Sequence, residues 1–184
     1  MSKNKPSQTA RIRSFSGFTI VELLIVIVVI GILATLVLLA FTNVADQANK
    51  TKVTHDLRQL SNAIELARSN SGKRLKDITG STATMYWCTQ KPSGTDLAKL
   101  PKTDQCWVDY NNALAAIGAA ANANFSNLVD PYGRPYYIDE NEGDPSFPPC
   151  IPDSISEYSR PFQTGYVNQP NTALTIHPID PACN

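Results

Sequence analysis

Glu22 is the residue in this sequence that raises the clearest chemical question. It directly precedes the apolar run Leu23–Phe41, LLIVIVVIGILATLVLLAF. A carboxylate at the edge of such a run is costly to bury and therefore needs a partner. The alternative is an ordinary membrane anchor whose glutamate stays at the membrane surface. Glu22 is therefore a candidate for a functional ion pair.

Four cysteines follow the apolar run: Cys88, Cys106, Cys150 and Cys183. None forms a CxxC pair and the chain has only two histidines, so zinc-ligand spacing is absent. An even number of cysteines beyond a membrane segment is typical of disulfides formed in an oxidising compartment. Three pairings are open, and local loop closure favours Cys88–Cys106 with Cys150–Cys183. Four buried free thiols are the alternative.

The other polar clusters predict neither catalysis nor strong nucleic-acid binding. The sequence contains no nucleophile elbow, phosphate loop, paired catalytic carboxylates or metal-ligand cluster, so we expect no enzyme. Arg134 lies among Tyr132, Tyr136 and Tyr137, a combination that could stack on bases. However, the chain beyond its basic N-terminal flank is acidic, and phosphate contacts require clustered Lys and Arg.

Charge is distributed unevenly along the 184 residues. The formal net charge is zero, but Lys3, Lys5, Arg11 and Arg13 precede the apolar run without any acidic residue. Without these four, 12 basic residues face 16 acidic ones, so the remainder is acidic. A basic flank of this kind predicts an N-terminus that stays in the cytoplasm and a C-terminal domain that is exported.

One long helix is expected to follow the basic flank. The apolar run approaches the ~20 residues that cross a ~30 Å hydrocarbon layer, and it is longer than the apolar region of a secretory signal. Beyond it, apolar residues at spacings of three and four predict a helix face that packs on a domain: Val53, Leu57, Leu60, Ile64 and Ala67. Gly72 is the expected helix stop.

After Gly72 the sequence predicts short elements and turns. We expect a strand at 84–88, a turn at 91–94, a short alanine-rich helix at 112–124 and a tight turn leading into a strand over 128–138. The proline-dense tail from Asp144 shows no regular pattern and is expected to be held by its two cysteines. The predicted fold class is α+β: a long N-terminal helix, with a membrane-spanning first half, packed on a small antiparallel sheet domain.

Gly17-Phe18-Thr19-Ile20-Val21-Glu22, followed by the apolar run, resembles the GFTxxE signature of type IV pilin and type II secretion pseudopilin precursors. This resemblance implies that a prepilin peptidase cuts after Gly17 and methylates the new amino group of Phe18. Glu22 would then pair with the Phe18 amino group of a neighbouring subunit. Such a buried pair serves mainly to set the register between helices.

The resemblance also implies a division of the chain and a set of partners. The division is a cleaved basic leader at 1–17, a transmembrane and assembly helix at 18–41, its amphipathic continuation at 42–71 and a globular head at 72–184. The partners are other copies of the subunit, the prepilin peptidase and an inner-membrane assembly platform. The subunit would begin as a single-pass protein of the cytoplasmic membrane and end in an extracellular or periplasmic filament.

A second segment, Asp130-Pro131-Tyr132-Gly133-Arg134-Pro135-Tyr136, resembles the DPxGxPY turn of major pseudopilins, although a plain proline-glycine turn is the local alternative. In major pseudopilins a calcium site stiffens the region that follows. The resemblance thus implies a weak calcium candidate, whose alternative is a solvated acidic turn without EF-hand spacing: Asp139, Glu140, Glu142 and Asp144. Leu39 departs from the family where a proline is frequent, which leaves the associated kink open.

Three functions compete on this basis. The first is a structural subunit of a pilus or of a secretion pseudopilus. The second is a minor pilin whose head binds a surface or DNA, and a basic or aromatic patch on the head would favour it. The third is a plain anchored domain, for which Glu22→Ala would leave function intact and the leader would be retained.

Overall fold

The computed structural model describes residues 17–125, 127–146, 148, 150–165, 173–179 and 183, without the side chains of residues 36–43. The basic residues of the predicted leader, from Lys3 to Arg13, lie outside this part of the chain. The chain divides into two compact units, Met1–Ala45 and Asp46–Asn184.

Helix α1 spans Ile20–Ser71 and enters both units. It ends where expected: Gly72 follows with φ of 66°, and its N–H donates to the carbonyl of Arg68. In the first unit the apolar side chains of residues 20–35 are exposed. Within the residues described, no helical segment is both long and apolar enough to cross a bilayer.

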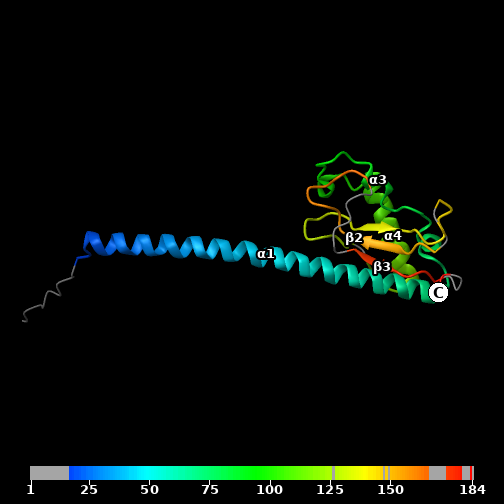
Figure 1. Ribbon diagram of the computed structural model, residues 1–184, viewed down its shortest axis with the longest axis horizontal. Helices are drawn as coiled ribbons and strands as arrows, with labels where there is room; N and C mark the ends of the chain where they lie inside the picture. Colours follow the sequence, from blue (N-terminus) through cyan, green and yellow to red (C-terminus); the bar gives the residue numbers. More distant parts are fainter. Residues whose placement is uncertain are drawn as a thin grey trace, which may run out of the picture. The chain divides into compact units, whose positions relative to one another are not determined.

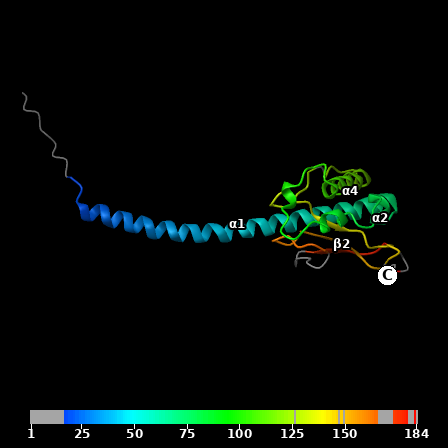
Figure 2. The ribbon, with the colours of Figure 1, turned by 90° about the horizontal axis from the view of Figure 1, so that it is seen from above.

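The second unit packs a head domain on the last part of α1 (Figure 1). The predicted apolar face is buried there: Val53, Leu57, Leu60, Ile64 and Ala67 are each at most 2% exposed. This face meets α4 (Gln105–Ala121) through Trp107, Tyr110 and Leu114, and it meets the sheet through Ile138 and Ile155. Figure 2 shows α4 and β2 on opposite sides of α1 in that view.

The sheet has three antiparallel strands in the order β1 (Tyr137–Asp139), β2 (Asp153–Ser156) and β3 (Leu174–Ile176). Ile138 pairs with Ile155, and Ile155 pairs with Leu174. The α+β class and the small antiparallel sheet are thus confirmed. The expectation of a patternless tail after Asp144 was wrong, because β2 and β3 lie within it. These strands are too short to produce a readable alternation, and they are defined by pairing, β2 with β1 and β3 with β2.

The strand predicted at 84–88 is also wrong, because the chain forms the short helix α3 (Tyr86–Thr89) there. Met85 and Cys88 are buried whereas Tyr86 and Trp87 are exposed, a helical spacing that a strand would not give. Nearby, α2 spans Leu75–Thr79, and a 3-10 turn, η1, spans Leu97–Lys99.

The helix predicted at 112–124 begins earlier than expected and ends at Ala121. Asp104 caps its N-terminus by accepting from the N–H of Cys106 at 3.0 Å. At its other end, Asn122 adopts the left-handed conformation with φ of 54°. The 91–94 turn and the turn leading into β1 are confirmed, since Gly94 has φ of 86° and Gly133 donates to the carbonyl of Asp130 at 3.0 Å.

Candidate assembly site

Glu22 forms a capping box with Thr19 at the start of α1. The Glu22 Oε2 atom accepts from the backbone N–H of Thr19 at 2.9 Å and from its hydroxyl at 2.8 Å. In return, the N–H of Glu22 donates to the Thr19 hydroxyl at 3.2 Å. These reciprocal bonds satisfy donors that the first helical turn leaves free, and the carboxylate complements the positive end of the helix dipole. Glu22 therefore has a partner within its own chain.

Sequence reasoning did not identify this role of Thr19. A threonine three residues before a glutamate and directly before an apolar run is itself the sequence signature of a capping box. The same residues form part of the GFTxxE segment, which we interpreted only as a processing and assembly signal. Thr19 should therefore be counted with Glu22 among the candidate site residues.

The apolar shell behind Glu22 is uncovered within the chain. Phe18 is 81% exposed, Ile20 is 85% exposed, and the apolar side chains that follow as far as Leu33 are about half exposed or more. Surfaces of this size are rare on soluble monomers and mark sites of contact with membranes or with other proteins. The part of α1 in the first unit is therefore a helix with exposed apolar side chains and with one carboxylate, Glu22, at its beginning.

In the second unit, Asp56 joins α1 to the residue that ends the DPxGxPY segment. Its Oδ2 atom accepts from the Tyr136 hydroxyl at 2.7 Å and from the Lys52 ammonium at 2.5 Å. Lys52 also donates to the carbonyl of Val129 at 2.8 Å, just before the turn. Burial and this carboxylate together raise the pKa of Tyr136 well above its usual range. Tyr136 therefore stays neutral and donates to Asp56.

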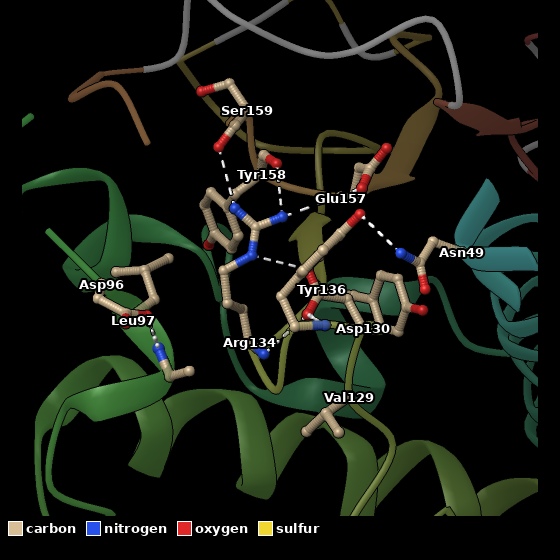
Figure 3. A network of polar contacts seen from close by, with 12 residues as sticks. Asn49, Asp96, Leu97, Val129, Asp130, Arg134, Tyr136, Glu157, Tyr158 and Ser159 are labelled. Carbon is tan, nitrogen blue, oxygen red and sulfur yellow. Dashed lines mark hydrogen bonds and ion pairs between the residues drawn. The ribbon is translucent and has the colours of Figure 1, made fainter. Parts of the chain in front are cut away.

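Arg134 organises the turn from within (Figure 3). Its Nε donates to Asp130 at 2.7 Å, and its two terminal nitrogens donate to the carbonyls of Tyr158 and Ser159 at 2.9 Å each. Asp130 also accepts from the backbone N–H groups of Tyr132 at 2.8 Å and Arg134 at 2.9 Å. The guanidinium thus fastens residues 158–159 to the turn.

The arginine and tyrosines considered for base stacking do not form an exposed surface. Arg134, Tyr136 and Tyr137 are each at most 5% exposed, so their rings and guanidinium cannot meet an external base. Tyr132 is partly exposed, and its ring is covered by Arg160 at 3.6 Å. The exposed aromatic pair of the head is instead Tyr86 and Trp87 on α3, in edge-to-face contact at 5.3 Å.

The four carboxylates of the calcium candidate do not converge. Glu140 accepts from the backbone N–H and the hydroxyl of Thr84, and Glu142 forms a buried ion pair with Arg68. Asp139 accepts from the Tyr137 hydroxyl, and Asp144 accepts from the N–H of Ser146. In the described part of the chain, no three histidine, cysteine, aspartate or glutamate residues are grouped to hold a metal ion. Calcium binding stays a prediction.

Arg68 is the centre of a buried polar cluster at the end of α1. Besides Glu142, it contacts the carbonyl of His177 at 3.0 Å and lies 3.9 Å from Asp153. Glu142 also accepts from the N–H of Ile179 at 2.8 Å. Burial raises the pKa of Asp153 to about 6 and that of Glu140 to about 7. The cluster holds the segment after β3 against the helix.

Both favoured disulfides are present. Cys88–Cys106 links α3 to α4 in a buried apolar cluster that also contains Leu97 and Phe162. Cys150–Cys183 joins the beginning and the end of the tail, and Cys150 is exposed. The first disulfide stabilises the head interior, and the second closes the tail.

Comparison with known proteins identifies the N-terminal region. Residues 12–38 match the prokaryotic N-terminal methylation motif. The chain is similar to the type II secretion system core protein G of Klebsiella michiganensis, with 35% identity over 63 residues. That match spans 34% of this chain and 44% of the relative, less than half of either. No solved structure matches the chain.

The motif contains Gly17, Phe18 and Glu22 together with all of the exposed apolar residues between 20 and 35. Pilins and pseudopilins that carry it are structural subunits, and the similarity to a pseudopilin points to the same group. The N-terminal part of the chain therefore resembles that of type IV pilins and type II secretion pseudopilins.

Proposed function

We propose that this chain is a filament subunit that is cut after Gly17, methylated on Phe18 and assembled through the first part of α1. The supporting observation is the exposed apolar shell of residues 20–35 with the capped carboxylate of Glu22 at its start. Before assembly this shell would lie in the cytoplasmic membrane, with the leader inside and the head outside. In the filament, the helices of other copies would replace the lipid.

Glu22 would pair with the Phe18 amino group of a neighbouring copy. The capping box supports this step, because it already holds the carboxylate at the helix start, close to where a neighbour's terminus would arrive. The pair would set the register between copies rather than add much stability. The chain would have no enzymatic activity of its own.

Among filament types, we favour a type II secretion pseudopilus over a retractable pilus. Two observations support this choice: the similarity to a type II secretion core protein and the DPYGRPY turn, which Arg134 and Asp130 hold together. A second candidate is a minor subunit with a binding head, supported by the exposed Tyr86 and Trp87 pair.

The test combines mass spectrometry with filament assembly. The full chain is expressed with a prepilin peptidase, and we expect the intact mass of Phe18–Asn184 plus one methyl group and two disulfides. Glu22→Gln keeps a hydrogen-bonding cap but removes the charge, whereas Thr19→Ala removes the cap but keeps the charge. We expect Glu22→Gln to block filament formation and Thr19→Ala to permit it at reduced yield.

Each outcome discriminates between the candidate functions. A leader that stays attached beside an active peptidase would contradict the proposal and favour the plain anchored domain. Normal filaments from Glu22→Gln would show that the charge has no role in assembly. Filaments that form only when another pilin is supplied in excess would favour the minor subunit.

A further inference from the structure

The aromatic pair on α3, Tyr86 and Trp87, stands out from the surface of the head. The two side chains are 43% and 47% exposed, whereas their neighbours Met85 and Cys88 are buried in an apolar cluster. Figure 1 shows α3 on the side of the head away from α1. Tyrosine and tryptophan that stand together in water are typical of binding surfaces, because each offers a large apolar ring with a polar group.

The backbone on both sides of the pair is held in place. Cys88, the next residue, is buried and bonded to Cys106 of α4. The carbonyl of Thr89, at the end of α3, accepts from the N–H of Gly165 and from the hydroxyl of Thr164, each at 2.9 Å. An aromatic side chain on a fixed backbone loses little conformational entropy when a ligand binds. The pair is therefore a preformed platform.

The two rings form a corner rather than a flat surface. Their planes are 82° apart and their centroids are 5.3 Å apart. Successive bases of a nucleic acid strand lie nearly parallel to one another, so they would not stack on both rings of this pair. A ligand with apolar faces in more than one direction fits the corner better.

The sequence around the pair carries little charge. Between Asp77 and Asp96 the single charged residue is Lys91, and the segment 161–165, whose end contacts α3, has none. The ammonium group of Lys91 donates to the carboxylate of Asp104 at 2.6 Å, so its charge is compensated within the head. A phosphate ligand requires clustered cations. The surface therefore favours a neutral ligand.

Gln90 places an amide on the same side of α3 as the two rings. It lies four residues after Tyr86 and three after Trp87, the spacings of neighbours on a helix, and it is exposed. Its backbone is still helical, with φ of −78° and ψ of −7°. An amide both donates and accepts hydrogen bonds, as a hydroxyl does, so Gln90 can bond to a ligand hydroxyl in either direction.

A sugar has the chemistry that this surface matches. A hexose ring carries C–H groups on its faces and hydroxyls around its rim, and C–H groups are attracted to the negative face of an aromatic ring. A protein partner fits less well, since a stable interface buries about 1,600 Å² around an apolar core. The other large apolar side chains exposed in the described part of the head, Leu66 on α1 and Ile179 after β3, lie on other elements and do not extend the pair.

We propose that Tyr86, Trp87 and Gln90 bind a neutral oligosaccharide, with sugar faces on the two rings and a hydroxyl on the Gln90 amide. This proposal develops the second candidate function, a subunit with a binding head, and it is separate from assembly through the first part of α1.

Tryptophan fluorescence tests the proposal, because the two tryptophans of the chain lie in opposite environments. Trp87 is 47% exposed and Trp107 is 1% exposed, so a ligand that covers the platform should shift the emission of Trp87 to shorter wavelength. The probes are maltohexaose, cellohexaose and chitohexaose, added to the full chain in a detergent without a sugar headgroup. We expect a saturable shift with at least one of them.

Variants separate the platform from the fold. Trp87→Ala and Tyr86→Ala should each weaken binding about tenfold by calorimetry, and Gln90→Ala should weaken it by a smaller factor. Leu66→Ala is the matched control, because it truncates a side chain that is 48% exposed on another element, and it should bind as the wild type does. In Trp87→Ala the remaining emission comes from the buried Trp107 and reports whether the head is folded.

The results separate the sugar site from other roles of the pair. No response to any of the three oligosaccharides, or equal binding by Trp87→Ala and the wild type, would overturn the proposal. Binding of oligo(dT) that requires Trp87 would assign the platform to nucleic acid instead. A folded Trp87→Ala chain that is processed but forms no filaments would make the pair a contact between copies.

Failure of the proposed filament function is distinguishable from failure of the sugar site. A wild-type chain that binds an oligosaccharide through Trp87 but keeps its leader beside an active peptidase would contradict the filament function and leave the sugar site standing. A chain that assembles normally but binds none of the three probes would do the reverse.

Discussion

The first and last parts of α1 differ in how their apolar side chains are covered. Both carry rows of large apolar side chains, yet those at 20–35 are exposed and those at 53–67 are buried. The later row alternates with polar residues and meets α4 and the sheet, whereas the earlier row is apolar on all sides. A helix that is apolar all round has no face to give to water. The earlier row therefore requires cover from outside the chain, and the later row is covered from within.

Truncating one side chain in each row should give the largest contrast. Leu60→Ala removes a fully buried side chain, and we expect it to lower the free energy of unfolding of the head by about 3 kcal/mol. Leu24→Ala changes a side chain that is 55% exposed, and it should leave head stability unchanged. Denaturant unfolding in detergent, followed by tryptophan fluorescence, measures both. Equal losses in the free energy of unfolding for the two variants would contradict this difference between the two rows.

The buried disulfide should stabilise the head that covers the apolar residues at 53–67. Replacing Cys88 and Cys106 by serine opens a loop of 18 residues, and we expect a loss of about 3 kcal/mol by thermal unfolding. In the native protein, mild reductant followed by alkylation and peptide mapping should label Cys150 and Cys183 first, because Cys150 is exposed whereas Cys88 and Cys106 are buried. Labelling of Cys88 before Cys150 would contradict this order.

Two buried carboxylates in the head should make its stability depend on pH. Folding raises the pKa of Glu140 to about 7 and that of Asp153 to about 6, above the values of the exposed groups. Between about pH 4 and pH 7 the folded head therefore binds more protons than the unfolded chain. The contribution of the two carboxylates to the free energy of unfolding thus falls as pH rises through this range. Denaturation midpoints at pH 4.5 and 7.5 measure this dependence.

Glu140→Gln isolates the share of one carboxylate. The variant should show a weaker loss of stability between pH 4.5 and 7.5 than the wild type, because glutamine does not titrate. An unchanged pH dependence would mean that Glu140 keeps an ordinary pKa in the folded head.

The smallest expected effect concerns the bond between α1 and the DPYGRPY segment. Tyr136→Phe removes the hydroxyl that donates to Asp56, and we expect a loss of about 1 to 2 kcal/mol in the free energy of unfolding. Tyr132→Phe is the control, since its hydroxyl accepts a longer hydrogen bond, 3.2 Å, from the amide of Asn49 on a less buried surface. Equal losses of stability in the two variants would show that the Tyr136–Asp56 hydrogen bond contributes no more than the Tyr132–Asn49 hydrogen bond.

Sequence reasoning succeeded where the pattern is local. The period of Val53, Leu57 and Leu60, the stop at Gly72 and the turn at Asp130–Gly133 each depend on neighbours a few residues away. The disulfide pairs also followed from the preference for short loops.

The failures concern contacts made across the chain. Strands β2 and β3 have four and three residues and are defined by pairing, and α3 is fixed by its packing on α4. The partner of Arg68 is 74 residues away at Glu142, a relation that no local spacing contains. The capping box of Thr19 and Glu22 is different, since its signal was local and visible but received another interpretation.

The position of Arg68 has a consequence for the timing of folding. Arg68 lies near the end of α1, but the carbonyl of His177, which it contacts, belongs to a segment 109 residues later, which is synthesised long after the helix. Until that segment has been synthesised, Glu142 lacks the N–H of Ile179, and Arg68 lacks the His177 carbonyl. A head truncated before residue 177 would keep its long helix but leave this cluster incomplete, which would make the interrupted product recognisable to proteases.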